Sequence, residues 1–469
     1  MKEIDAFLTW LNGYLWGPPM LVLLFGTHIF LTFRLRFIQL YTPLAIKISF
    51  GRSKEGEGDV SQFGALTTAL AATIGTGNIV GVATAVALGG PGAVLWCWLT
   101  GVFGISTKYA EALLAVKYRV KTSDGSMLGG PMYALEHGLK MKWAAVVFSI
   151  FTAIAAFGIG NLVQANSISK MAAEMASKWL TPESAQRVPW VVGIVLTILT
   201  GAVILGGIKS IARVCERLVP FMAVFYVLGC LVILAFGLKT IPATIALIIK
   251  SAFTGQAAAG GFAGATIMMA ARAGIARGLF SNESGLGSAP IVAAAAQTRN
   301  PVRQALVSST GTFWDTVVVC AITGLVLVNT GVWNSGLQGE VLTHAAFDTV
   351  HSLGPIVLTI GLLTFVFSTI LGWSYYGEKA MEYLLGKRAI LPYRVAWVAA
   401  VMVGSVVVPK VVWNFADAAN ALMAIPNLIA LLLLSGVVVA ETRKYLWSGN
   451  LDAAMPEPVE ERETVSALD

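Results

Sequence analysis

Charged residues are scarce in this chain of 469 residues: Asp, Glu, Lys and Arg make up 12% of it, and hydrophobic residues make up 56%. A soluble domain carries about 25% charged residues, so this chain has too few to cover a water-facing surface. Apolar segments long enough to cross a bilayer, about 20 residues each, recur from end to end, and the mean hydropathy is +0.75. The sequence therefore predicts an all-α integral membrane protein.

Cysteine and histidine are also few, with four of each. The cysteines are scattered singly, without a CxxC pair, so neither a disulfide framework nor a structural metal site is expected. The histidines have no nucleophile or metal-ligand spacing around them, so we predict that the protein is not an enzyme. The basic residues lie between hydrophobic runs, which argues against nucleic-acid binding. An acidic N-terminus without a cleavage site predicts no cleavable signal peptide.

The hydrophobic runs predict about eleven spans, of which the first is an extra N-terminal helix. We divide the chain into this helix with a cytoplasmic loop (1–61), two repeats (62–237 and 238–446) and a disordered cytoplasmic tail (447–469). The segment 241–254 is either an outer amphipathic helix or the first half of the seventh span. The spans are placed at about 17–35, 62–88, 92–116, 143–170, 190–208, 218–237, 256–276, 303–328, 354–378, 391–408 and 413–440.

Basic residues are distributed unevenly between alternate loops. Most of them, including Arg34, Arg119, Arg217, Arg272 and Arg277, fall in one set of loops. Because basic residues concentrate on the cytoplasmic side, we expect the N-terminus outside and the C-terminus in the cytoplasm of a bacterial or archaeal plasma membrane. The opposite set contains only Lys2, Lys170, Lys178, Arg187, Lys239, Lys250 and Lys410.

Two spans contain residues that disfavour a continuous helix near the middle of the membrane. Gly75-Thr76-Gly77-Asn78 interrupts the second span, and the glycine-rich run 258–266 interrupts the seventh. Lipid cannot satisfy the backbone groups that a break exposes, so a break persists where it lines a protein-enclosed cavity. Close helix packing through small residues is the alternative. These two spans begin successive sets of five with opposite orientation, which is typical of a secondary transporter with a midplane site.

Four stretches carry a resemblance to a known family: Gly75–Ala83, Gly89–Ala93, Gly129–Tyr133 and Ala276–Pro290. On these motifs the chain resembles the alanine/glycine:cation symporters, also called sodium:alanine symporters, over nearly its whole length. The resemblance implies a leucine-transporter-type core of two inverted five-helix repeats, preceded by one extra helix. It also implies sodium as the coupling ion.

The resemblance assigns roles to residues of the second and ninth spans. The N–H groups of Thr76 and Gly77 would hold the substrate carboxylate, with the Asn78 side chain as a further ligand. Hydroxyl groups on helices more often bond back to carbonyls one turn earlier, and this is the alternative for the sodium-site hydroxyls. The expected sodium ligands are the carbonyls of Ala71, Ile74 and Phe365 and the hydroxyls of Ser368 and Thr369.

Three further side chains have both a substrate and a packing interpretation. Trp373 lies one turn after Thr369, where it either caps the substrate side chain or packs against neighbouring helices. Phe262, next to Gly261 in the second break, has the same two explanations. Gln164 either reaches the substrate or bonds a neighbouring helix.

Five charged residues stand in or beside the spans. Asp315 is the one carboxylate set well within a span, so it must be protonated, paired or linked to an ion, and it either supports the seventh-span break or belongs to a gate. Lys108 and Glu111, one turn apart, are expected to pair. Arg277 and Glu283 flank the inner mouth and form either a gate or a fixed loop.

These observations predict a sodium-coupled symporter of small neutral amino acids, alanine and glycine, working by alternating access. Coupling to protons or transport of glutamine is the near alternative. An ion channel is the rival from another class, but a channel needs repeated filter groups around a pore. The expected partners are the amino acid, sodium and membrane lipid.

Overall fold

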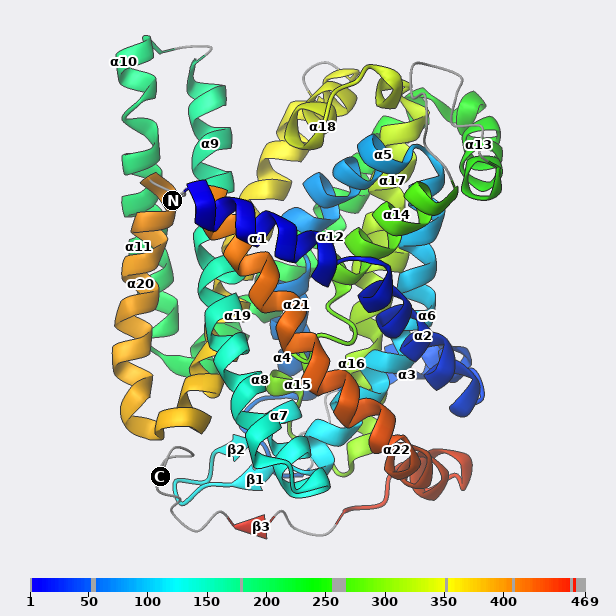
Figure 1. Cartoon of the computed structure of the whole chain (residues 1–469), viewed down its shortest axis with the longest axis vertical. Coiled ribbons are helices and arrows are strands. Elements are labelled where there is room, and N and C mark those ends of the chain that lie inside the picture. The colour runs from blue at the N-terminus through cyan, green and yellow to red at the C-terminus, as the bar shows by residue number, and fades with distance from the viewer. Residues whose placement is uncertain are drawn as a thin grey trace.

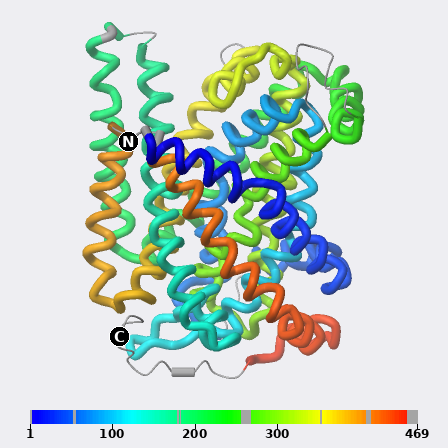
Figure 2. The backbone as a smooth tube through the Cα atoms, viewed as in Figure 1, coloured from blue at the N-terminus to red at the C-terminus, as the bar shows by residue number. Residues whose placement is uncertain are grey.

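The computed structural model describes residues 2–51, 56–177, 180–254, 267–350, 353–406, 410–455 and 459–460. Nearly all of this chain is helical, and the helices run roughly side by side between two ends of the molecule (Figure 1). One end carries α13 and α18, and the other carries the short strands and α22. Figure 2 shows the N-terminal helices crossing the front of this bundle.

Long helices account for most of the predicted spans. Eight helices of the described chain are long and apolar enough to cross a membrane, or nine if one bent pair counts as a single span, so the predicted count of eleven is not confirmed. The principal helices are α1 (Lys2–Leu15), α2 (Pro18–Arg34), α4 (Gln62–Thr73), α5 (Val82–Gly89), α6 (Gly92–Lys117), α8 (Lys142–Ala155), α9 (Val163–Ser177), α11 (Val188–Ile204), α12 (Gly207–Phe236), α13 (Ile241–Phe253), α14 (Ile267–Asn282), α16 (Pro301–Thr312), α17 (Ala321–Asn329), α19 (Leu353–Leu385), α20 (Ile390–Val406) and α21 (Lys410–Leu433).

Shorter elements connect them. The segment 241–254 proves to be a separate helix, α13, which packs against α6 and α17. The shorter helices and the strands are α3 (Thr42–Ser49), α7 (Pro131–Tyr133), α10 (Pro182–Ala185), α15 (Pro290–Ala293), α18 (Gly339–Asp348), α22 (Ser435–Thr442), β1 (Val120–Lys121), β2 (Met127–Leu128) and β3 (Val459–Glu460). Five π-helical turns are η2 (Gly77–Gly81), η3 (Ala134–Gly138), η4 (Ala156–Leu162), η6 (Phe313–Cys320) and η9 (Arg443–Trp447), and the 3₁₀ turns are η1 (Ile38–Tyr41), η5 (Leu238–Thr240), η7 (Val332–Asn334) and η8 (Lys387–Ala389).

The helices pack in two groups that meet along α4 and α19. In one group α6 packs against α2, α14 and α16, and α14 packs against α5. In the other, α8, α9, α11 and α20 pack against α19, and α21 packs against α8. The contact of α19 with α4, and of α12 with both, joins the groups. The interface between the groups is therefore the place where a buried site would form.

The start of the C-terminal tail is ordered, although the sequence predicted disorder from residue 447. The Asn300 amide donates to the carbonyls of Leu451 and Ala453, and Arg303 pairs with Asp452 at 2.6 Å. Further along, β3 pairs with β1 in parallel. The tail contains few large apolar residues, so backbone and charged groups make these contacts rather than a core.

A buried arginine fastens the loops at the same end. Arg119 donates to the carbonyls of Ala294 and Ala296 and to that of Glu57. Burial lowers the pKa of Arg119 to about 10, and the nearby acidic groups oppose that shift. The guanidinium therefore keeps its charge at neutral pH and holds three loops together.

Candidate functional site

The first predicted break is present between α4 and α5. The helix axis bends by 52° between Gln62–Thr73 and Gly77–Gly89, and Ile74 has the non-helical angles φ −76° and ψ 95°. The Asn78 side chain accepts a hydrogen bond of 2.8 Å from the Gly75 N–H. A polar side chain thus satisfies one backbone group that the break releases, as buried backbone groups require.

Gly75 has a steric reason to be glycine. A Cβ atom at this position would lie 2.6 Å from the Thr369 hydroxyl oxygen of α19. One turn earlier, Ala72 lies against Gly372, where an added Cβ would come within 2.7 Å of the alanine. Small residues on both helices therefore bring the broken segment directly against α19.

The run 258–266, with Gly261 and Phe262, lies outside the described residues. The described interruption that faces the first break comes later, after α14 ends at Asn282. Its backbone turns through positive φ angles at Glu283 (55°), Gly285 (92°) and Gly287 (87°) before α15 begins at Pro290. A Cβ on Gly77 would lie 3.4 Å from the Ser281 Cα, so the two interruptions are in contact.

The course of α14 corrects the placement of two basic residues. Arg272 and Arg277 lie within α14, which packs along α5, the half of the first broken helix opposite to α4. They therefore do not belong to the loop that contains Arg299. The guanidinium of Arg277 lies 5.9 Å from the Phe280 ring and interacts electrostatically with Asp417 of α21. A gate formed by Arg277 and Glu283 stays a prediction.

Asp315 binds both interrupted segments. Its carboxylate accepts hydrogen bonds from the Asn78 amide at 2.7 Å, from the Ser281 hydroxyl at 3.0 Å and from the Thr316 hydroxyl at 2.6 Å. Asp315 is fully buried in η6. This residue therefore ties the first break to the end of α14. Support of the predicted break at 258–266 and a part in a gate both stay predictions for Asp315.

Glu111 binds the backbone of the second interruption. One of its carboxylate oxygens accepts the N–H groups of Gly285 and Gly287, at 3.0 and 3.1 Å, and the Asn427 amide at 2.7 Å. No ion pair joins Glu111 to Lys108 among the described residues, so the expected pairing is wrong. Sequence spacing within one helix could not reveal partners that lie so far along the chain.

Oxygen atoms gather where α19 faces the first break. The Phe365 carbonyl accepts hydrogen bonds from the hydroxyls of Ser368 at 2.8 Å and Thr369 at 2.9 Å, and the Thr369 hydroxyl lies 3.4 Å from the Ile74 carbonyl. Ala71 is fully buried on α4, one turn before Ile74. A set of carbonyl and hydroxyl oxygens fits a hard cation. The structure also agrees with the alternative interpretation, in which these hydroxyls only bond within their own helix. The hydroxyls of Ser368 and Thr369 both donate to the Phe365 carbonyl, one turn earlier.

Trp373 and Gln164 lie on opposite sides of a close contact. A Cβ on Gly160 would lie 2.3 Å from the Trp373 Cβ, so the tryptophan packs against η4. The Gln164 amide donates to the Ile159 carbonyl at 3.0 Å, and its own oxygen has no partner among the described residues. Both residues are almost fully buried.

Three π-helical turns coincide with these polar groups. Asn78 lies in η2, Gly160 in η4 and Asp315 in η6. A π-turn widens a helix by one residue, and such turns are frequent at functional sites. The hydrophobic periodicity of the sequence does not predict where these π-helical turns lie.

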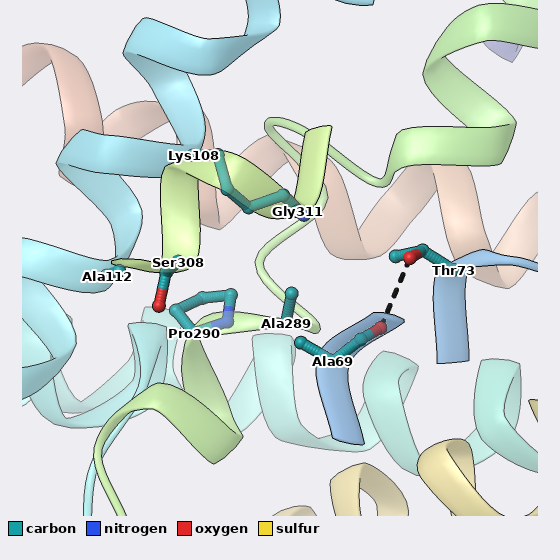
Figure 3. A pocket seen from close by; sticks show the side chains of 8 residues that line it. All are labelled: Ala69, Thr73, Lys108, Ala112, Ala289, Pro290, Ser308 and Gly311. Atoms are coloured by element: carbon teal, nitrogen blue, oxygen red, sulfur yellow. Dashed lines mark hydrogen bonds between the residues drawn. The ribbon is translucent and has the colours of Figure 1, made fainter. Parts of the chain in front are cut away.

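A small cavity lies beside the site rather than within it. Figure 3 shows that α4, α6, α16 and the segment before α15 supply its lining, with Lys108 reaching toward Gly311. The residues that line it are Ala69, Thr73, Lys108, Ala112, Ala289, Pro290, Ser308 and Gly311.

Comparison with known proteins agrees with this architecture. Residues 1–457 match the model of the sodium:alanine symporter family. The chain belongs to this family. It is 54% identical over 454 residues to the sodium/alanine symporter AgcS of Methanococcus maripaludis, covering 94% of this chain and 97% of that protein. It is 36% identical to the probable sodium/glutamine symporter GlnT of Bacillus subtilis, covering 92% and 89%.

A solved structure shows the same fold. The crystal structure of MhsT in complex with L-phenylalanine superposes with a TM-score of 0.58, at 16% identity, covering 84% of this chain and 95% of that one. The family membership shows a multi-pass membrane transporter for amino acid symport and not an enzyme. The likeness to MhsT shows that the fold is of the leucine-transporter type.

Proposed function

We propose that this symporter carries small neutral amino acids, alanine and glycine, into the cell together with sodium, by alternating access. The observation that supports it best is the contact between two interrupted segments and the oxygen group of α19. The N–H groups of Thr76 and Gly77, where the second half of the broken helix begins, would suit a carboxylate, because a helix N-terminus favours anions. The oxygens of Ile74, Phe365 and Thr369 suit a cation beside it.

The packing of Trp373 favours a small substrate. Its side chain lies directly on Gly160 and next to Tyr376, with ring centroids 5.5 Å apart. Such close packing leaves little room for a long side chain between α19 and η4. Glutamine is the second candidate, because a relative at 36% identity is a probable sodium/glutamine symporter.

The proposed arrangement has the N-terminus outside, the C-terminus in the cytoplasm and two inverted repeats at 62–237 and 238–446. The uneven distribution of Lys and Arg between alternate loops supports this orientation, because basic residues concentrate on the cytoplasmic side. Arg119, Lys121 and Lys387 lie at the end that carries the strands, which would be cytoplasmic.

Uptake of labelled alanine, glycine and glutamine into liposomes tests the proposal. We expect accumulation of alanine and glycine against their gradients when an inward sodium gradient is imposed, and none when sodium is equal on both sides. Equal uptake with and without the gradient would contradict sodium coupling. Accumulation of glutamine alone would reassign the substrate.

A further inference from the structure

Two loops lie side by side where the chain enters the first broken helix and where it leaves the second interruption. Val60 and Ala296 form a parallel β-bridge, and the Gln297 N–H donates to the Val60 carbonyl at 2.7 Å. The Ala295 carbonyl accepts two further N–H groups from the first loop, at 2.7 and 3.2 Å. Backbone hydrogen bonds therefore join the segments 56–60 and 294–298, which we name the paired loops.

The paired loops approach each other more closely than side chains would allow. An added Cβ on Gly56 would lie 2.3 Å from the Thr298 carbonyl oxygen, and one on Gly58 would lie 2.3 Å from the Gln297 nitrogen. Both contacts are with backbone atoms, which cannot rotate away as the end of a flexible side chain could. The two loops therefore fit together as a fixed pair.

The buried Arg119, between α6 and β1, binds both loops at once. One guanidinium nitrogen donates to the carbonyls of Ala294 and Ala296 at 3.1 and 2.9 Å, and another donates to the Glu57 carbonyl at 3.0 Å. The planar guanidinium suits this task because it presents several donors in fixed directions. A buried charge is costly unless it is hydrogen-bonded, and Arg119 is 3% exposed. Separation of the loops would take acceptors from this cation, so Arg119 opposes it.

The same two parts of the chain are also tied together at the site. The first loop leads into α4 and the first break, and the second loop follows α15 and the interruption at 283–289. Asp315 accepts hydrogen bonds from Asn78 of the first break and from Ser281 near the end of α14, at 2.7 and 3.0 Å. Movement of one part without the other would therefore break contacts at both the site and the paired loops.

The contact between α4 and α12 has a different character. The two helices pack against each other, and the Ser61 hydroxyl at the start of α4 donates to the Glu216 carboxylate at 2.8 Å. No backbone hydrogen bond joins α4 to α12 in the described part of the chain. Side chains can separate and bind water instead, so the surface between α4 and α12 is where this end of the molecule can open.

We propose that Arg119 joins the paired loops into one unit, so that α4 and the segment 283–293 move together when the site opens at this end. Arg119 touches neither the amino acid nor the sodium ion of the proposed site, so it is a positioning residue that sets the rate of opening. This inference rests on alternating access in the proposed function, and it names the part of the chain that moves.

A disulfide across the β-bridge tests whether the loops move together. Val60→Cys with Ala296→Cys places two thiols on bridge partners, whose backbones are close enough for a disulfide, and the four native cysteines are buried. We expect equal sodium-driven alanine uptake into liposomes by the oxidised and the reduced protein, with the bridge confirmed by mass spectrometry. Loss of uptake on oxidation that reduction reverses would overturn the proposal.

A bridge between α4 and α12 is the comparison. Ser61→Cys with Glu216→Cys, linked by a short bifunctional methanethiosulfonate, fixes the unit to α12. Uptake should stop when the thiols are linked and return when the link is reduced, and the unlinked double variant is the control. Continued uptake by the linked protein would overturn the proposal, because the unit would then not leave α12.

Arg119→Gln distinguishes positioning from binding. A glutamine amide can reach one loop at most, so the maximal rate of alanine uptake should fall about tenfold, because hydrogen bonds from a charged group are lost. The half-saturating concentrations of alanine and sodium should stay as in the wild type. The oxidised cysteine pair at 60 and 296, added to Arg119→Gln, should restore the rate. The matched control, Arg388→Gln, alters an exposed cation of η8 and should behave as the wild type.

The outcomes separate this inference from the proposed function. Absence of sodium-driven uptake by the wild type would overturn the function itself. A wild type that transports, with an Arg119→Gln rate that is unchanged or that the disulfide does not restore, would overturn the unit alone. Should the cysteine pair fail to fold, the Arg119→Gln rate and the bridge between α4 and α12 decide by themselves.

Discussion

At the scale of single residues, the Thr369 hydroxyl connects the two helix groups. It donates to the Phe365 carbonyl at 2.9 Å and lies 3.4 Å from the Ile74 carbonyl. A hydroxyl between two carbonyls is an oxygen that a cation in the same place would use. Removal of the Thr369 hydroxyl should therefore weaken the binding of sodium more than the binding of the amino acid.

Thr369→Ala should therefore weaken the apparent affinity for sodium about tenfold, because one lost oxygen ligand is worth about 1.5 kcal/mol. Thr369→Ser keeps the hydroxyl and should stay close to the wild type. The measurement is the sodium concentration that gives half-maximal alanine uptake. An unchanged sodium dependence in the alanine variant would remove Thr369 from the ion site.

Asn78 bridges the Gly75 N–H and the Asp315 carboxylate, so its loss should disturb the first break. Asn78→Ala leaves the Gly75 N–H without its partner, at a cost of about 1–3 kcal/mol, and removes one of the three side chains that donate to Asp315. We expect uptake to fall below detection while size-exclusion profiles stay monodisperse. Asn450→Ala, after η9, removes an exposed amide as a control and should keep full uptake. Normal transport by Asn78→Ala would contradict the assigned role.

At the scale of elements, the contact between α4 and α19 depends on glycine. Gly75→Ala places a Cβ 2.6 Å from the Thr369 oxygen, so one of the helices must move. Overpacking of this kind costs about 1–3 kcal/mol, and it falls on the proposed ion site. We expect a lower melting temperature in detergent and a loss of sodium-dependent uptake.

Gly26→Ala is the matched control, because an added Cβ on α2 would meet no atom within 4 Å. This variant should melt at or above the temperature of the wild type, since alanine favours helices. Equal effects of the two substitutions would show that the α4–α19 contact has no special part in transport.

At the scale of the whole molecule, the orientation in the membrane is open to a direct test. The four native cysteines are buried, so a single introduced cysteine reports its own position. Glu3→Cys and Arg388→Cys lie at exposed positions of the described chain. A membrane-impermeant thiol reagent should label residue 3 in intact cells, and residue 388 only after the cells are opened. The reverse pattern would invert the topology.

Much of the architecture could be predicted from the sequence, because the lipid bilayer limits which secondary structures can form within it. A bilayer core demands apolar helices of a minimum length and internal satisfaction of backbone groups. Apolar runs therefore predicted the bounds of α2 and α6 closely, whereas α12 begins before its predicted span and α19 ends after it. The glycines and polar residues at 75–78 gave the first break for the same reason. The four motif stretches predicted the family to which the chain belongs.

Only the tertiary structure decided which polar groups meet. It placed the described second interruption at 283–289, where Glu111 and Asn427 bind it. Among the described residues it left the Lys108 ammonium without a hydrogen bond to Glu111. It also brought Asp315 to both breaks through π-helical turns. Hydrophobic periodicity reports which residues avoid lipid and water, whereas partners hundreds of residues apart are fixed by helix packing, which leaves no mark on local sequence.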